Sequence, residues 1–349
     1  MNLLANLHTL RSQIVFHLVR KPRYLLLKDE NDINFERGIL CISADLELAW
    51  AWRYDRNSKI NSEKIGLQER ENTPKILKKL DELQIPITWA IVGHLFLKSC
   101  ERKNGVAHPE MPRPDYFKNA YWEFKKGDWY EFDACTDYKS APAWYAPDLI
   151  ESILNSKVKH EIACHTFSHI GFNERYCPKE LAEAEIIKCN AIMLQFGIKP
   201  VSMIFPGEEA GYFELLVRHG YKYMRYFPLI KVEISRPIKL KEGIWAILVS
   251  SNIIPDENWN SGYILWRLKK YVDKAIEKKA LCHFWFHPSI SKQRIEEALF
   301  PILEYCAKKK EEGKLDIMTM KEVGELMECK AKALPNNRDQ IFTGHSKEV

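Results

Sequence analysis

The chain alternates strand-like and helix-like segments over most of its 349 residues, and this alternation limits the fold more than any other feature. Apolar or period-2 runs predict strands, and longer runs with apolar residues at helical spacing predict the helices between them. The predicted strands cover residues 38–48, 85–92, 201–205, 221–226, 281–286 and 315–318. Such alternation is typical of α/β proteins with a mainly parallel sheet. With seven or so units, and no G-x-G-x-x-G motif, P-loop or G-x-S-x-G elbow, the sequence favours a distorted (β/α) barrel of about seven parallel strands.

The predicted barrel occupies residues 38–329 and is interrupted at about 104–147 by an aromatic-rich insertion that does not follow the alternation. Residues 1–37 are predicted to be an amphipathic helical extension, with leucines at helical spacing and basic residues near its end. Such a segment can lie on a membrane surface, although packing against its own domain is the favoured interpretation. The polar stretch 330–349 is predicted to be a flexible tail.

Charge and cysteine content argue against several classes of protein. The net charge is +5, and the basic residues are interspersed with glutamates, so no nucleic-acid partner is expected. Nine cysteines without a C-x-x-C pair argue against a disulfide framework and against a cysteine-based zinc site. No apolar run is long enough to cross a membrane, and the first residues lack the layout of a signal peptide. We therefore expect a cytoplasmic protein, with peripheral membrane contact through the N-terminal segment as an open alternative.

Two carboxylates share one face of the first predicted strand. Because side chains alternate along a strand, Asp45 and Glu47 point to the side opposite Ala44 and Leu46. Two acids so close would be costly in a dry core, but they are reasonable if a cation neutralises one and the other accepts a proton. The alternative is that Glu47 lies beyond the strand, in solvent.

A histidine pair occupies one face of a later strand. His283, Trp285 and His287 alternate with phenylalanines that face the surrounding helices, and Pro288 ends the strand. His287 therefore lies at the carboxyl end of the strand, where barrel enzymes carry their catalytic groups. A single histidine there would more often be structural, and two on the barrel-facing side favour function.

A second histidine pair, His165 and His169, follows a short predicted strand at the end of the segment 160–169. If the chain turns helically from His165, both imidazoles lie on one face and can share a metal ion. A pair of partly exposed loop histidines is an equally good interpretation of the spacing.

The insertion is rich in aromatic residues, and such rings either stack on sugars or pack over the mouth of the barrel. Packing is the favoured interpretation of the set as a whole. The candidates for direct contact with a carbohydrate are Trp122, Trp129, Trp144 and Tyr145.

Three segments together resemble the polysaccharide deacetylase (NodB-homology) superfamily, also called carbohydrate esterase family 4. They are Ser43–Glu47, which is similar to a variant of that family's first motif, His160–His169, which looks like its second, and Phe284–Pro288, which looks like its last. The resemblance extends over roughly Gly38 to Met327. It implies a distorted (β/α) barrel and metal-assisted removal of an N- or O-acetyl group from a sugar or glycan precursor.

Carried over by position, the resemblance implies a role for each motif residue. Glu47, His165 and His169 would bind a divalent metal, for which zinc suits the ligand set, so that a water is activated. Asp45 would act as base and His287 as acid, with His283 supporting His287. Which of Asp45 and Glu47 binds the metal stays open in this motif variant.

The sequence departs from the family at the third motif, which normally brings an arginine that holds the catalytic aspartate. The segment Ile204–Glu208 has none, and Gly207 stands in its place. Arg225 could reach in from a later strand, although the sequence alone does not indicate it. The missing arginine leaves open a barrel that binds carbohydrate without catalysis. A hydrolase of a non-sugar C–N bond also stays open, since the resemblance extends to barrels that act on C–N bonds of small cyclic compounds.

Overall fold

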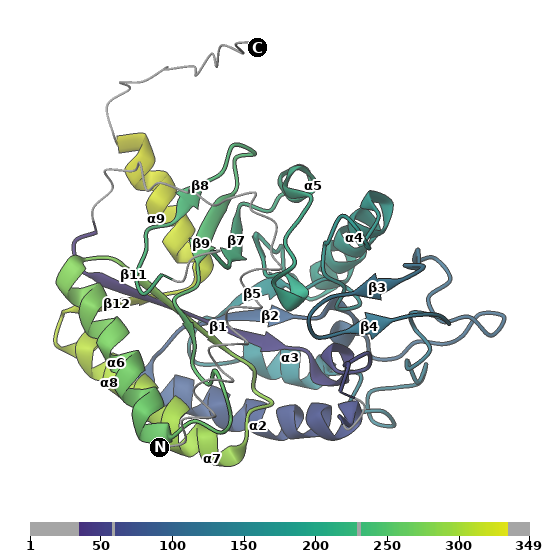
Figure 1. Ribbon diagram of the computed structural model, residues 1–349, viewed down its shortest axis with the longest axis horizontal. Coiled ribbons are helices and arrows are strands. Elements are labelled where there is room, and N and C mark those ends of the chain that lie inside the picture. The colour runs from purple at the N-terminus through teal and green to yellow at the C-terminus, as the bar shows by residue number, and fades with distance from the viewer. Residues whose placement is uncertain (1–34, 58–59, 229–231, 334–349) are drawn as a thin grey trace, which may run out of the picture.

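The computed structural model describes residues 35–57, 60–228 and 232–333, and its centre is one curled, mostly parallel sheet that forms a half-barrel (Figure 1). Every strand pairing in this sheet is parallel except that of β8 with β9. The structure confirms the predicted distorted barrel. In sheet order the strands are β10 (Ser251–Asn252), β11 (Leu281–Phe286), β1 (Gly38–Leu46), β2 (Thr88–Ile91), β5 (Glu161–Cys164), β6 (Ser202–Met203), β7 (Tyr223–Tyr226), β9 (Trp245–Leu248) and β8 (Ile238–Lys239), with β12 (Leu315–Met318) also paired to β1.

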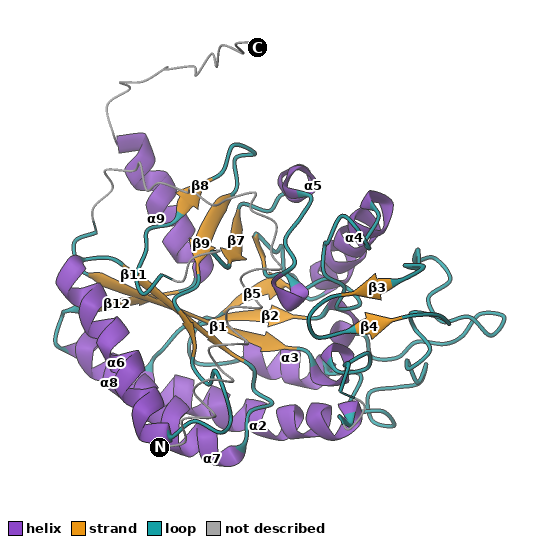
Figure 2. Ribbon diagram, in the orientation of Figure 1, coloured by secondary structure: helices purple, strands orange, loops and turns teal. Residues whose placement is uncertain are grey.

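Helices pack around the sheet, most of them on its outer side (Figure 2). The α-helices are α2 (Ser62–Leu83), α3 (Pro147–Leu154), α4 (Lys179–Gln195), α5 (Phe213–Arg218), α6 (Ser261–Lys278), α7 (Lys292–Arg294), α8 (Phe300–Glu311) and α9 (Met320–Ala333). Short 3-10 turns are η1 (Leu48–Ala51), η2 (Gly93–Phe96) and η3 (Pro206–Glu208), and η4 (Ile295–Leu299) is a π-helical turn between α7 and α8. None of the helices in the described part of the chain is both long and apolar enough to cross a membrane.

The two faces of β1 belong to different cores, as the period-2 pattern predicts. Leu40, Ile42 and Ala44 are buried in the large core shared with the outer helices. Ile39 and Cys41 are buried in a second core on the inner side of the sheet. The polar residues that continue this inner face therefore point into the half-barrel.

Helix α9 contributes to the inner core through its side chains Met320, Val323 and Met327. Two backbone amides at the start of α9 bind groups on neighbouring strands: that of Met320 donates to Thr88 Oγ1 and that of Lys321 donates to Glu161 Oε2, both at 2.8 Å. Since Thr88 and Glu161 are the first residues of β2 and β5, α9 covers the amino end of the sheet. A site built from inward-facing side chains is therefore expected at the carboxyl end of the sheet.

Several predicted boundaries differ from the structure. Helix α2 begins at Ser62, where the side chain of Asn61 accepts from the Lys64 amide at 2.9 Å, whereas Thr73 followed by Pro74 has the sequence pattern of a helix start. The proline instead lies within the helix, where Thr73 Oγ1 donates to the carbonyl of Glu69. Helix α9 continues to Ala333, beyond the predicted start of the tail at residue 330. The predicted extension 1–37 falls almost entirely outside the described residues.

The aromatic-rich insertion contains one short antiparallel hairpin, β3 (Phe117–Lys118) and β4 (Glu123–Phe124), within long loops at one side of the barrel (Figure 1). Phe117, Phe124 and Tyr130 of this segment are buried in the large core. The insertion is therefore a packed cap, and its fold depends on the barrel beneath it.

Candidate active site

Glu47, His165 and His169 converge at the carboxyl end of the sheet. Oxygen Oε1 of Glu47 lies 2.9 Å from Nε2 of His165 and 3.0 Å from Nε2 of His169. All three side chains are buried. Although burial raises the pKa of the Glu47 carboxyl, the charges of His287 and His169 and the hydrogen bonds of His165 and His169 hold it well below its usual range. The sequence placed these residues in one site, and the structure brings them together.

The loop after β5 gives the two histidines their positions, and it is not helical. Thr166 and His169 adopt left-handed backbone conformations, with φ of +56° and +58°, which are uncommon for residues other than glycine. The two histidines therefore lie in a loop, one of the two interpretations of their spacing, but they are buried and share one place as the helical alternative required. Glu185 of α4 fixes the loop by accepting from the Ser168 amide at 2.8 Å and from the Ser168 hydroxyl at 2.7 Å.

His165 also has a fixed ring orientation. Its Nδ1 lies 2.7 Å from the carbonyl oxygen of Ile204, so Nδ1 carries the hydrogen and Nε2 is left with a lone pair. Two imidazoles and one carboxylate are a common donor set for a catalytic zinc ion, and three protein ligands leave a coordination position for water or substrate. The residues present therefore fit a divalent metal ion.

Asp45 is held by Arg225, which comes from β7 on the far side of the half-barrel. The guanidinium binds both carboxylate oxygens, with Nη1–Oδ1 of 2.6 Å and Nη2–Oδ2 of 2.5 Å. Both residues are buried, at 2% and 4% exposure. The arginine that the third motif lacks is thus supplied from another strand. This arrangement separates the two acids, since Asp45 faces an arginine and Glu47 faces two imidazoles.

His287 lies at the end of β11 beside both acids. Its Nε2 is 3.4 Å from Glu47 Oε2 and 3.9 Å from Asp45 Oδ2, and a quarter of its side chain is exposed. Burial lowers the pKa of His287, but the charges of Glu47, Asp45 and Glu69 outweigh it and raise that pKa to about 9. His287 is thereby suited to carry a proton at the open side of the site.

His283 does not support His287, which corrects the role expected for it. It is fully buried, and its Nε2 forms a hydrogen bond of 3.0 Å with Ser43 Oγ. The same hydroxyl accepts from Arg225 Nη1 at 3.0 Å. Burial, with the charge of Arg225, lowers the pKa of His283 to about 3. His283 is a neutral residue behind the site that helps to position Arg225 through Ser43.

Glu69 of α2 is a buried acid that sequence reasoning missed. Its Oε1 accepts from the backbone amide of Glu47 at 2.8 Å. Burial, followed by the charge of Glu47, raises the pKa of Glu69 to about 8. A signal was present in the sequence, because Glu69 lies seven residues before Ile76 on the same buried helical face.

Three of the four aromatic residues predicted to bind substrate are buried in the core instead. Trp129, Trp144 and Tyr145 are at most 3% exposed, because the insertion packs on the barrel with these rings inward. The indole of Trp129 donates to Ser168 Oγ at 2.8 Å, so it too supports the histidine loop. Trp122 stays partly buried beside the site, its ring centroid 4.8 Å from that of His169.

Two further tryptophans, Trp52 and Trp285, lie beside His287, with ring centroids 6.3 and 5.1 Å from the imidazole. Only Trp285 had been placed on the barrel-facing side of its strand from the sequence. Aromatic rings therefore lie beside both His287 and His169, the latter next to Trp122.

Comparison with known proteins identifies a family for part of the chain. A family model for polysaccharide deacetylase matches residues 63–222, a range that contains the histidine loop but neither Asp45 nor His287. Residues 63–222 therefore form a polysaccharide deacetylase domain. This domain indicates a hydrolase of the deacetylase type. A search of curated proteins gave no significant match.

Solved structures show the same fold over most of the chain. A putative polysaccharide deacetylase from Mycobacterium smegmatis aligns over 86% of this chain and 94% of its own, with TM-score 0.58 and 14% identity. A probable polysaccharide deacetylase from Pseudomonas aeruginosa PAO1 aligns over 88% and 98%, with TM-score 0.59 and 13% identity. A PuuE allantoinase aligns over 89% and 98%, with TM-score 0.57 and 13% identity.

Proposed function

We propose that this protein is a metal-dependent deacetylase that removes an N- or O-acetyl group from a sugar or glycan precursor. The observation that carries the proposal is the pairing of two different acids in one site. Glu47 lies with His165 and His169 in a set of metal ligands, while Asp45 is paired with Arg225 and is free of those imidazoles. The family model supports a sugar as the substrate.

A divalent ion held by Glu47, His165 and His169 would polarise the acyl carbonyl and increase the acidity of water in the site. Asp45 accepts the proton of the attacking water, while Arg225 keeps the carboxylate in place and balances its charge. His287 donates a proton to the sugar nitrogen or oxygen as its bond to the acyl carbon breaks. The products are acetate and the free amine or hydroxyl.

Arg225 favours catalysis over a binding-only barrel. A protein that only binds sugar has no need for a buried arginine–carboxylate pair at the carboxyl end of the sheet, and such a pair brings little stability of its own. The fold is shared with an allantoinase as well, so the resemblance of folds does not distinguish a sugar amide from another C–N bond.

The test is acetate release from acetylated sugars by the zinc-reconstituted protein. A panel of N-acetylglucosamine oligomers and O-acetylated xylan covers amides and esters, and a cyclic ureide such as allantoin represents the alternative C–N bond. We expect acetate from at least one sugar, and its loss in His165→Ala together with one equivalent of bound zinc. Hydrolysis of the ureide alone, or no hydrolysis while zinc is bound, would contradict the proposal.

Trp122 provides a separate prediction about substrate contact. Replacing it with alanine is expected to raise KM about tenfold, a loss of about 1.4 kcal/mol, with little change in the free energy of unfolding. Trp122→Phe retains a ring next to His169 and should recover most of the affinity. Steady-state kinetics on the best substrate measure both variants, and an unchanged KM in Trp122→Ala would show that this ring does not touch the sugar.

A further inference from the structure

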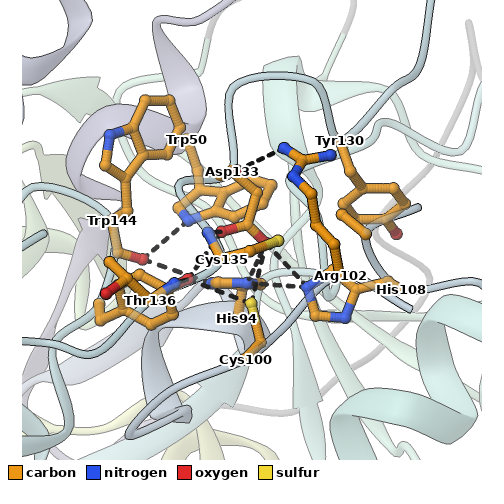
Figure 3. A network of polar contacts seen from close by, with 12 residues as sticks. Trp50, His94, Cys100, Arg102, His108, Tyr130, Asp133, Cys135, Thr136 and Trp144 are labelled. Carbon is orange, nitrogen blue, oxygen red and sulfur yellow. Dashed lines mark hydrogen bonds and ion pairs between the residues drawn. The ribbon is translucent and has the colours of Figure 1, made fainter. Parts of the chain in front are cut away.

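Four side chains that could bind a metal ion gather at a second place, between the barrel and the insertion (Figure 3). His94 lies in η2, directly after β2, whereas Cys100, His108 and Asp133 come from the loops that lead into and through the insertion. One atom from each of the four lies within 4.8 Å of every other. His94 and Asp133 are almost fully buried, His108 is 6% exposed, and Cys100 is partly buried.

Three of these atoms form a nearly equilateral triangle. Oδ2 of Asp133 lies 2.9 Å from Nε2 of His94 and 2.9 Å from Nε2 of His108, and the two nitrogens are 3.0 Å apart. A point just above such a triangle is about 2.0 Å from all three corners, which is the length of a Zn–N or Zn–O bond. Cys100 Sγ lies 3.4 Å from the same Oδ2, in reach of a fourth position.

Hydrogen bonds alone cannot satisfy all three atoms of this triangle. An imidazole nitrogen carries either one hydrogen or one lone pair, and a carboxylate oxygen only accepts. If both Nε2 atoms carry hydrogens, the two N–H groups of His94 and His108 face each other at 3.0 Å. If one of them carries none, its lone pair faces that of Asp133 Oδ2 at 2.9 Å. A cation that replaces the hydrogens and binds one lone pair from each of the three atoms removes the repulsion.

Neighbouring groups hold the ligand atoms in this orientation. Asp133 Oδ1 accepts from the Tyr145 hydroxyl at 2.7 Å and from the Cys135 amide at 3.0 Å, so Oδ2 is left for the imidazoles. His94 Nδ1 lies 3.4 Å from the carbonyl oxygen of Trp144, which favours a hydrogen on Nδ1 and a lone pair on Nε2. Such partners, behind the ligands, are what metal-binding histidines and carboxylates ordinarily have.

The active site has the same local geometry. There, too, a single carboxylate oxygen, Glu47 Oε1, lies 2.9 and 3.0 Å from two imidazole Nε2 atoms. The two sites differ in what completes them. Glu47, His165 and His169 leave a position open, whereas the second cluster has a thiol as fourth donor and three buried residues out of four, and four protein ligands are usual in structural zinc sites.

We propose that His94, Cys100, His108 and Asp133 bind a second divalent ion, and the mixture of nitrogen, oxygen and sulfur donors points to zinc. Its role is structural. The insertion has only the two-residue strands β3 and β4 as regular structure, and long loops of this kind need additional links to stay folded. The ion would link three loop residues, Cys100, His108 and Asp133, to His94 of η2.

Backbone hydrogen bonds connect the proposed second site to the histidine loop of the active site. The amides of Gly93 and His94 donate to the carbonyls of Thr166 and Phe167 at 2.8 and 2.9 Å. His165 directly precedes these residues. Loss of the second ion is therefore expected to loosen the histidine loop as well as the insertion.

The experiment counts zinc in the purified full-length protein after reconstitution with zinc and removal of the excess. We expect two equivalents in the wild type, one in His169→Ala, one in His108→Ala, and two in Cys135→Ser. The last is a matched control, since Cys135 lies beside Asp133 but its sulfur is not one of the four ligand atoms.

Cobalt substitution identifies the thiolate ligand by its absorption spectrum. Cobalt-loaded His169→Ala should show the thiolate-to-cobalt charge-transfer band, because only the second site contains a cysteine, and Cys100→Ser in the same background should lose it. One equivalent or fewer in the wild type, no metal in His169→Ala, or a thiolate band that survives Cys100→Ser would overturn the proposal. None of these readouts depends on the reaction that the active site catalyses.

Discussion

Replacing Asp45 with asparagine is expected to lower kcat for acetate release by about 10²–10⁴-fold, the usual contribution of a positioned general base. Asparagine keeps the shape of the side chain but does not accept a proton from water. The proposed metal ligands Glu47, His165 and His169 are untouched, so bound zinc should stay at the wild-type level. Steady-state kinetics and elemental analysis of the same preparation measure the two quantities.

The control for this variant is Asp115→Asn, which removes a carboxylate from an exposed position in the insertion. Its kcat should equal that of the wild type. If Asp45→Asn kept activity within tenfold of the wild type while holding its metal, Asp45 would not be the base, and the proton would have to leave through another group such as His287.

Replacing Arg225 with methionine is expected to destabilise the protein by about 3–5 kcal/mol, the range measured when one partner of a buried ion pair is removed. The Asp45 carboxylate would then be buried without its bidentate partner, and Ser43 would lose a donor as well. Urea unfolding at neutral pH measures the change. Arg225→Lys keeps the charge but not the two parallel hydrogen bonds, so it should be intermediate in stability and in activity.

Two variants make this measurement interpretable. Arg218→Met removes an exposed arginine whose ion pair with Glu183 lies at the surface, and it should leave the free energy of unfolding nearly unchanged. Asp45→Asn combined with Arg225→Met removes the uncompensated charge and should recover part of the lost stability without restoring activity. An Arg225→Met protein as stable as the wild type would show that the pair is not buried in solution.

Local patterns predicted the part of the site that lies on single strands. Side-chain alternation placed Asp45 on the inner face of β1, and the predicted bounds of β11, 281–286, agree with the structure. Alternation is set by the backbone of each strand alone, so it can be read without knowing the neighbours. The contact between Asp45 and Arg225 depends instead on how far the sheet curls between β1 and β7, and no run of residues in the sequence encodes that curvature.

The roles of the aromatic residues and of the proposed second metal site could not be predicted from the sequence for a different reason. Trp129 and Trp144 were candidates for sugar contact because stacking and core packing use the same residue types, and only burial separates the two roles. His94, Cys100, His108 and Asp133 are separated by loops of unequal length, so they match no ligand spacing. The argument from cysteine pairs also fails to detect a site with a single cysteine.

The guanidinium opposite Asp45 reaches its partner from β7, although the linear motif that would ordinarily supply it has a glycine at that position. The reaction requires a positive charge opposite the aspartate, and it does not matter which strand carries the arginine. A different strand can therefore supply this residue without loss of the reaction. A screen that scores motifs one by one would class this protein as a degenerate, inactive relative. To distinguish active enzymes from inactive relatives, one must therefore check whether another part of the fold supplies the missing side chain.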